Sequence, residues 1–413
     1  MTITIPSLPA LTSVCNIYLW YGQSNSTGTS SNRLFSVSDP TFGAAKVFGL
    51  DGRQSRDGTT LTWADLSYPP SVLNFTPLAA TEINEPFRAR TREVSFFKAM
   101  ERVNAAQISA TGERHRAVVA TFGHTGYTLA RLIKTENAYT NLINGLTEIM
   151  VDVAAAGLTG IVRGVVYIQG EADFASSGSG WASSVTTLQS NLNTDIKAVT
   201  GQSQNVPLFL SQQSNFCAST SAPYAGTIPY PVLDQLSAHN GTSVILTGPM
   251  PGETISNNNF HYYGHQAQLN GVAIGNALAA VVVNAQTWNP VRPKTISRSS
   301  NLVDIEFWTP SGAVVLDTTY ASNTSDGFYG FDFRQTGGTT TLQSVTQLNS
   351  TTLRFTLSGA PNGTTPRIRG GRNPNAGAAV AGLRTGARVC LRDTSSTDAS
   401  FCNWGIAFDE LIP

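Results

Sequence analysis

Short apolar runs alternate with longer amphipathic stretches between about residues 16 and 285. The apolar runs predict buried strands, which we expect at 16–21, 117–122, 163–168, 207–210 and 243–247. The amphipathic stretches predict helices at about 92–109, 138–156, 182–199 and 264–284. Alternation of this kind predicts an α/β fold, a parallel sheet covered by helices on both faces.

Two stretches of this region differ from the alternating pattern, the last predicted helix and residues 32–90. The last predicted helix is rich in small residues, including Gly271 and Gly275, so we expect it to pack tightly against the sheet. Residues 32–90 contain few periodic segments. Because a structureless loop of that length is unusual, the stretch is interpreted as an elaborated cleft wall or as containing short strands.

The pattern changes near Trp288-Asn289-Pro290, beyond which short alternating strands are separated by turn clusters. The predicted strands are 303–307, 313–316, 342–345 and 352–357. This pattern predicts a C-terminal all-β, sandwich-like module. A chain of 413 residues is long enough for two domains, and we expect them at 1–288 and 289–413.

The composition narrows the classes of partner. The formal net charge is zero, so neither a nucleic acid nor a membrane surface is expected as a partner. No apolar stretch reaches the ~18 residues of a membrane-spanning helix. The first residues lack the basic and apolar regions of a signal peptide. Charged residues make up only 13%, a composition common in extracellular and virion proteins, and an extracellular or virion-associated location is expected.

Cysteine and histidine spacing predicts no metal site and no other cofactor. His261 and His265 have the helical spacing of paired ligands, but no cysteine or carboxylate accompanies them. The four cysteines form no CxxC pair. Cys390 and Cys402 are close enough in sequence for a bridge across a hairpin, the alternative being small buried thiols.

Chemically active residue types follow the ends of the predicted strands. In chain order these segments are Gly22-Gln23-Ser24-Asn25, Gly123-His124-Thr125-Gly126, Gln169-Gly170-Glu171 and Ser211-Gln212-Gln213, followed by His261 at the start of the last helix. Ligands of open parallel sheets bind beyond the carboxyl ends of the strands. The sequence therefore predicts that these residues gather at one site.

Ser24 is the candidate nucleophile, because a serine in a tight turn at a strand end projects into a cleft where a base can reach it. His261 is the best candidate for that base; the alternatives are His124, His265, His239 and His115. An acyl transfer also needs donors for an oxyanion. The backbone N–H groups of Ser24 and Gly126 and the Gln169 side chain could supply them. Together these residues predict a serine esterase.

These residues resemble the SGNH (GDSL-like) hydrolase superfamily, specifically carbohydrate esterases of the sialate O-acetylesterase type. The resemblance covers about residues 15–285 and rests on Gly22-Gln23-Ser24-Asn25, the segment from Gly126, Gln169-Gly170-Glu171 and Asn258-Asn259-Phe260-His261. It implies a three-layer α/β/α sandwich and metal-free removal of O-acetyl groups from sugars through an acyl-serine. Gln23, Asn25 and Glu171 would then support the site, Glu171 by orienting a neighbouring loop or by acting as the acid.

One position departs from the family pattern. The family's acid stands three residues before the histidine, and here that residue is Asn258. Asparagine can orient an imidazole but cannot stabilise imidazolium as a carboxylate does. We favour a Ser24–His261 dyad oriented by Asn258 or a backbone carbonyl. The alternatives are another acid, Glu253 or Glu171, or an impaired enzyme. Gly123 could also replace Gly126 in the glycine block.

The predicted function is therefore deacetylation of a carbohydrate or polysaccharide. The C-terminal module would bind glycan or mediate assembly, as a homo-oligomer or on a virion or cell surface; phage tail proteins that deacetylate surface polysaccharides combine such parts. Two alternatives remain. One is a glycan-binding or adhesin module on an impaired esterase fold, and the other is an esterase for lipid or aryl esters.

Overall fold

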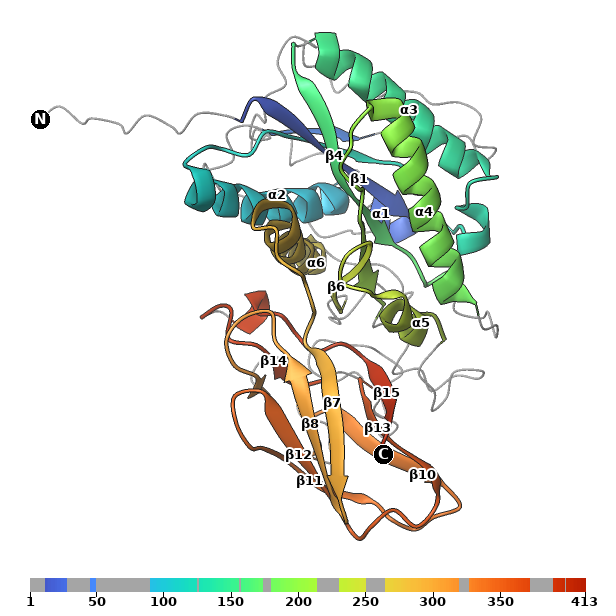
Figure 1. Cartoon of the computed structure of the whole chain (residues 1–413), viewed down its shortest axis with the longest axis vertical. Coiled ribbons are helices and arrows are strands. Elements are labelled where there is room, and N and C mark those ends of the chain that lie inside the picture. The colour runs from blue at the N-terminus through green and yellow to red at the C-terminus, as the bar shows by residue number, and fades with distance from the viewer. Residues whose placement is uncertain are drawn as a thin grey trace, which may run out of the picture.

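The structure is a computed structural model, and its described residues are 12–27, 45–49, 90–124, 126–155, 157–173, 180–213, 230–249, 264–318, 327–371, 389–397 and 399–413. Two parts follow each other along the chain: helices around a parallel sheet, and then a β-rich module (Figure 1).

A six-stranded sheet forms the centre of the first part, in the order β2-β3-β1-β4-β5-β6. Its strands are β1 (Val14–Gly22), β2 (Ala45–Gly49), β3 (Ala117–Thr121), β4 (Thr159–Ile168), β5 (Leu208–Gln212) and β6 (Val244–Pro249), and every pair is parallel. The five predicted strands are confirmed. The sixth, β2, lies inside the stretch 32–90, where the sequence pattern placed no strand.

Helices cover both faces of this sheet and confirm the three-layer α/β/α architecture (Figure 1). On one face lie α2 (Arg90–Thr111) and α6 (Gly264–Leu278), which ends in a π-helical turn, Ala279–Val283. On the other lie α3 (Asn137–Ala155) and α4 (Trp181–Thr200), with the shorter α5 (Tyr230–Ala238). A single turn, α1 (Ser24–Thr27), follows β1, and a 3₁₀ turn, Leu129–Arg131, precedes α3.

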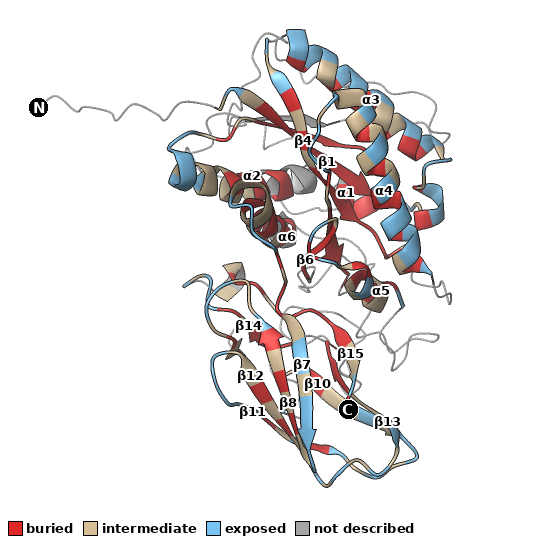
Figure 2. Ribbon diagram, viewed as in Figure 1, coloured by how far each residue is buried: buried red, intermediate tan, exposed pale blue. Residues whose placement is uncertain are grey.

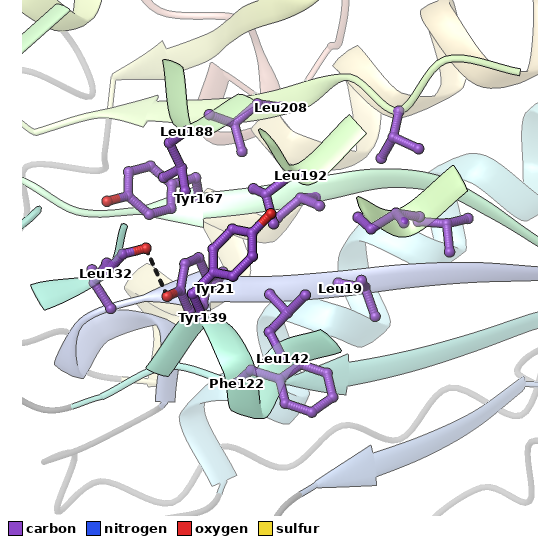
Figure 3. Close-up of a cluster of buried hydrophobic side chains, with 14 of the residues drawn as sticks. Leu19, Tyr21, Phe122, Leu132, Tyr139, Leu142, Tyr167, Leu188, Leu192 and Leu208 are labelled. Atoms are coloured by element: carbon purple, nitrogen blue, oxygen red, sulfur yellow. Dashed lines mark hydrogen bonds between the residues drawn. The ribbon is translucent and has the colours of Figure 1, made fainter. Parts of the chain in front are cut away.

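The two faces of β1 bury alternate residues in two separate cores, as the two-residue period of a strand requires. Ile17, Leu19 and Tyr21 belong to the core beneath α3 and α4, whereas Tyr18 and Trp20 belong to the core beneath α2 and α6. Figure 2 shows this sheet as the buried centre of the part. Figure 3 shows the first core, where the Tyr21 hydroxyl donates to the Leu132 carbonyl at 2.9 Å.

Helix α6 packs against the sheet as predicted, through residues such as Ile274 and Leu278. Its glycines, however, serve a different contact. A Cβ at Gly271 would lie 2.4 Å from the Ser95 carbonyl oxygen of α2, and one at Gly275 would lie 2.8 Å from Ala99. The small residues therefore allow close approach of two helices rather than of helix and sheet.

The C-terminal module consists of antiparallel sheets around a core rich in phenylalanine. A four-stranded sheet, β11-β12-β8-β7, lies beside a three-stranded sheet, β10-β13-β15, and a two-stranded ribbon, β14-β9. The bounds are β7 (Arg292–Ser299), β8 (Leu302–Trp308), β9 (Val315–Leu316), β10 (Phe331–Thr336), β11 (Leu342–Gln347), β12 (Thr352–Leu357), β13 (Thr364–Gly370), β14 (Leu391–Arg392) and β15 (Phe408–Leu411). The predicted all-β module is confirmed.

Buried contacts join the module to the first part. Ile406 packs in the core beneath α3 and α4. The Gln212 side chain, at the end of β5, donates to the Ala407 carbonyl at 2.8 Å and accepts from the Ala407 N–H at 2.7 Å. Nearby, Asn276 of α6 donates to the Asn403 side chain at 3.0 Å. The edge of the sheet that carries the strand ends is thus tied directly to the β module.

Three further observations concern the chemistry of the described residues. Cys390 and Cys402 are buried thiols and form no disulfide. No group of three or more histidine, cysteine, aspartate or glutamate side chains in the described part could hold a metal ion. None of the described helices is long and apolar enough to cross a membrane.

Candidate active site

Ser24 lies at the carboxyl end of the central strand, where Gly22 forces a sharp turn. Gly22 has a φ of 125°, and a Cβ there would lie 2.0 Å from the carbonyl oxygen of Ile168, the last residue of β4. Only glycine fits both the conformation and the space. The turn then closes with the Ser26 hydroxyl donating to the Gln23 carbonyl at 2.6 Å. Ser24 therefore follows the end of β1 beside β4, and it is buried together with its neighbours Gln23 and Asn25.

The carboxyl group of Glu171 holds both residues that flank Ser24. Asn25 Nδ2 donates to Glu171 Oε1 at 2.5 Å, and Gln23 Nε2 donates to Glu171 Oε2. Gln23 also accepts from the Ala172 N–H at 3.0 Å. The loop after β4 therefore fixes the turn after β1 through side chains that neither strand contributes. These contacts are of the kind that the loop-orienting alternative for Glu171 requires, and that role stays a prediction.

The pKa of Glu171 is raised from 4.5 to about 7, mainly by burial and in small part by the nearby charge of Asp173, while the hydrogen bonds from Asn25 and Gln23 oppose the shift. A carboxyl group with this pKa is about half protonated at neutral pH. The oxygen that carries the proton is a poorer acceptor, so its hydrogen bond to Gln23 or Asn25 is weaker. The geometry of the Ser24 turn is therefore coupled to a titration near neutrality.

Gln169 is fully buried at the end of β4, and both hydrogens of its amide are engaged within the protein. Its Nε2 donates to the Tyr127 carbonyl at 2.9 Å and to Asp173 Oδ2 at 2.8 Å. An oxyanion would have to displace one of these acceptors to be bound by Gln169. In this geometry the amide instead holds the backbone next to Gly126 in place.

Asp173 completes this arrangement and was not singled out from the sequence. It accepts from the Leu129 N–H at 2.9 Å and from the Trp181 indole N–H at 3.2 Å. Together with the Gln169 bond, these contacts anchor the loop after β3 to the loop after β4. Its position two residues beyond Glu171 was the available signal, but an aspartate in a loop is too common to carry a prediction.

Gly126, the predicted oxyanion donor from the loop after β3, is exposed and has a φ of 76°. A Cβ there would meet nothing within 4 Å, so the conformation rather than space favours glycine. The same loop begins next to the nucleophile turn, because the His124 N–H donates to the Gly22 carbonyl at 2.8 Å. The structure thus places the loops after β1, β3 and β4 at one edge.

His124 is the alternative base that lies at this edge. Its ring is buried, stacks on Tyr127 at 4.8 Å between centroids, and its Nε2 has no partner among the described residues. Burial, with the nearby Arg131 charge, lowers its pKa to about 4. Because general bases work best with a pKa near the operating pH, this environment disfavours His124 as the catalytic base.

Two other histidines have structural partners. His115 bonds the Tyr18 hydroxyl at 2.9 Å and stands just before β3, at the opposite end of the strand from the site. His239 accepts from the Leu246 N–H at 3.0 Å and bonds the Asn289 side chain. The predicted base His261, its predicted partner Asn258 and the alternative acid Glu253 lie outside the described residues, as does the side chain of His265.

Comparisons with known proteins give structural matches. No family model and no curated protein sequence matches the chain. A carbohydrate acetylesterase from Xanthomonas citri matches over 92% of this chain and 80% of its own, with 17% identity and a TM-score of 0.51. A protein from Arabidopsis thaliana matches 64% of this chain and 97% of its own (14% identity, TM-score 0.38), and NanS matches 67% and 98% (10% identity, TM-score 0.41). The similarity to the Xanthomonas enzyme shows a shared fold.

Proposed function

We propose that this chain is a serine esterase that removes O-acetyl groups from a carbohydrate. The observation that carries the proposal is the turn at Ser24, which Gly22 shapes and which the Glu171 carboxyl group holds from both sides. This turn follows the carboxyl end of a central parallel strand, and ligands of such sheets bind beyond these ends, which supports the proposal. Two neighbouring loops, after β3 and β4, are anchored to the same turn and would lie beside the substrate.

In the mechanism that we propose, His261 takes the proton of Ser24, and the hydroxyl oxygen attacks the acetyl carbonyl. The oxyanion is held by the backbone N–H groups of Ser24 and Gly126. Gln169 contributes as a positioning residue, since it holds the Tyr127 carbonyl beside Gly126. Collapse of the tetrahedral intermediate breaks the bond to the sugar oxygen, which leaves as a hydroxyl with the proton returned by His261. Neutral His261 then takes a proton from water, which attacks the acetyl-serine, and returns that proton to Ser24 as acetate leaves.

Asn258 takes the place of an acid in this proposal. It orients the His261 ring without neutralising the imidazolium that forms, so the enzyme works as a dyad. The supporting observation is that Glu171 is committed to Gln23 and Asn25 and so is engaged elsewhere. A dyad of this kind predicts slower turnover than a complete triad.

The carbohydrate substrate is proposed from the fold and its likeness to a carbohydrate acetylesterase. The C-terminal module, through which a glycan could be bound or copies assembled, is joined to the sheet edge by the Gln212–Ala407 pair. We extend the proposal to an extracellular or virion-associated polysaccharide deacetylase.

Hydrolysis of p-nitrophenyl acetate tests the proposal in the full chain. Ser24→Ala should lower kcat/KM by at least about 10³-fold, and His261→Ala should do the same. Ser26→Ala is the matched control: it removes a hydroxyl of the same turn, so it should weaken turnover without abolishing it. His124→Gln should retain most of the turnover, because the pKa of His124 is too low for the base.

Two outcomes would contradict the mechanism. Unchanged turnover in Ser24→Ala would remove Ser24 as nucleophile. A wild-type chain that hydrolyses neither p-nitrophenyl acetate nor acetylated polysaccharide, yet binds the glycan, would identify the adhesin alternative.

A further inference from the structure

Two adjacent glutamines at the end of β5 are both fully buried but are bonded in opposite ways. The Gln212 amide donates to the carbonyls of Val232 and Ala407 and accepts from the Ala407 N–H. The Gln213 amide has no hydrogen-bond partner for either Oε1 or Nε2 among the described residues. The Gln212 amide is therefore hydrogen-bonded on both sides, whereas the Gln213 amide makes no hydrogen bond within the described part of the chain.

An amide buried without partners is costly, because it loses its hydrogen bonds to water and gains none. A buried polar group in this condition needs a specific explanation, and a ligand that completes its hydrogen bonds is one. A leucine at 213 would fill a similar volume without that cost. The glutamine thus occupies a position where folding alone favours an apolar side chain.

Gln235 fixes the backbone at Gln213, and Gly170 leaves space for the Gln213 amide. The Gln213 N–H donates to Gln235 Oε1 at 2.8 Å, and Gln235 Nε2 donates to the Gln169 carbonyl at 2.7 Å. Gln235 therefore ties together the ends of β4 and β5. A Cβ at Gly170, which has a φ of 140°, would lie 2.8 Å from Gln213 Oε1. The absence of a side chain at 170 makes room for this oxygen.

This amide lies within the neighbourhood of the proposed nucleophile. It contacts Gly170, the next residue is Glu171, and Glu171 holds the residues on both sides of Ser24. Gln169, whose Oε1 is also buried without a partner in the described part, stands on the other side of Gly170. The unpartnered acceptors and donor therefore gather at the ends of β4 and β5, beside the Ser24 turn.

We propose that Gln213 is a specificity-determining residue whose amide binds a free ring hydroxyl of the sugar that carries the acetyl ester. The inference rests on the proposed function and names the hydroxyl group of the substrate that the site recognises. A hydroxyl both donates and accepts, so it can bond Gln213 Oε1 and Nε2 together, whereas a simple aryl ester such as p-nitrophenyl acetate offers no such group. A site that pairs a substrate hydroxyl discriminates strongly against analogues that lack it.

The first test compares two mono-O-acetylated methyl glycosides, one with a free hydroxyl next to the ester and one deoxy at that carbon. The wild-type chain should prefer the hydroxylated ester, and Gln213→Leu should lower that preference about 10- to 100-fold. The fall should appear in kcat/KM for the hydroxylated ester and not for the deoxy ester. Equal losses for both esters, or no change in their ratio, would overturn the proposal.

The second test needs no turnover and separates a binding amide from a structural one. In the ligand-free chain, Gln212→Leu should lower Tm by at least about 3 °C, because it leaves the Ala407 and Val232 groups unpaired. Gln213→Leu should leave Tm unchanged or raise it. A fall in Tm for Gln213→Leu as large as for Gln212→Leu would overturn the proposal, since the amide would then be structural. Failure of the esterase mechanism shows separately, as unchanged turnover in Ser24→Ala, where Gln213 is intact.

Discussion

At the scale of single residues, the site depends on a carboxyl group kept in an unfavourable place. Glu171 is buried, and burial acts against its charge, yet two side-chain amides converge on its oxygens. Only the ionised form can accept fully from Gln23 and Asn25 at once. The protein therefore loses stability to hold the nucleophile turn, as is common where function requires a defined geometry.

The first prediction concerns the pH dependence of stability that follows from this carboxyl group. The pKa of Glu171 is about 7 in the folded protein against 4.5 ordinarily, so the folded state binds the proton more tightly than the unfolded chain. Stability should then fall as the pH rises from about 4.5 to about 7, by as much as about 3 kcal/mol. Urea unfolding at a series of pH values measures it.

Glu171→Gln is the control, because it removes the titration and keeps the size of the side chain. The difference in unfolding free energy between wild type and variant should change across that pH window and level off on either side. Parallel profiles for the two proteins would mean that the pKa of Glu171 is not raised.

At the scale of elements, helix contacts and strand ends set the frame that carries the site. Helices α2 and α6 approach so closely that Gly271 faces the Ser95 carbonyl. In the sequence, residues 250–263, which include the predicted base His261, come directly before α6.

We predict that Gly271→Ala destabilises the protein by about 1–3 kcal/mol, although alanine is the better helix former. The added Cβ would lie 2.4 Å from a backbone carbonyl, which cannot move without shifting α2. The matched control is Gly359→Ala, where a Cβ meets nothing within 4 Å. Thermal unfolding measures both. Equal or higher stability for Gly271→Ala would show that the helices separate without cost.

Elements with a strong local pattern could be predicted from the sequence, and the rest depend on distant partners. The run Ile17-Tyr18-Leu19-Trp20-Tyr21 is buried on both faces, and its continuous apolar character identified β1. By contrast β7, Arg292–Ser299, is largely exposed and has no apolar alternation, so pairing with β8 alone makes it a strand.

The same distinction holds for the site. Ser24, Gln169 and Glu171 could be identified because each follows a recognisable strand. The hydrogen-bond partners of these side chains could not be predicted. Gln169 binds the Tyr127 carbonyl 42 positions away, and Glu171 binds Asn25, which is 146 positions away. Sequence spacing carries no record of such contacts. The importance of Gln213 likewise depends on Gly170 and Gln235, neither of which is its neighbour in sequence.

At the scale of the whole molecule, the question is whether the two parts form separate domains. The sequence predicts a boundary near residue 288, from a change of pattern. Yet Ile406, near the end of the chain, packs in the core beneath α3 and α4, and the Ala407 backbone bonds Gln212 at the end of β5. Arg102 of α2 also stacks on Phe401, 5.7 Å from the ring centroid. The last residues thus complete the sheet edge beside the proposed specificity residue.

We therefore predict that the full chain unfolds in one cooperative transition, with calorimetric and van't Hoff enthalpies in agreement. A fragment of residues 1–288 should be markedly less stable or insoluble, because it exposes the surface that Ile406 covers and removes both Ala407 partners of the Gln212 amide. Gln212→Leu should lower the single Tm without splitting the transition, since it removes the Gln212–Ala407 hydrogen bonds but leaves the other contacts between the two parts. Scanning calorimetry of the three proteins gives the answer. Two resolved transitions in the full chain, with the fragment reproducing one of them, would instead establish independent domains and assign the β module a role of its own.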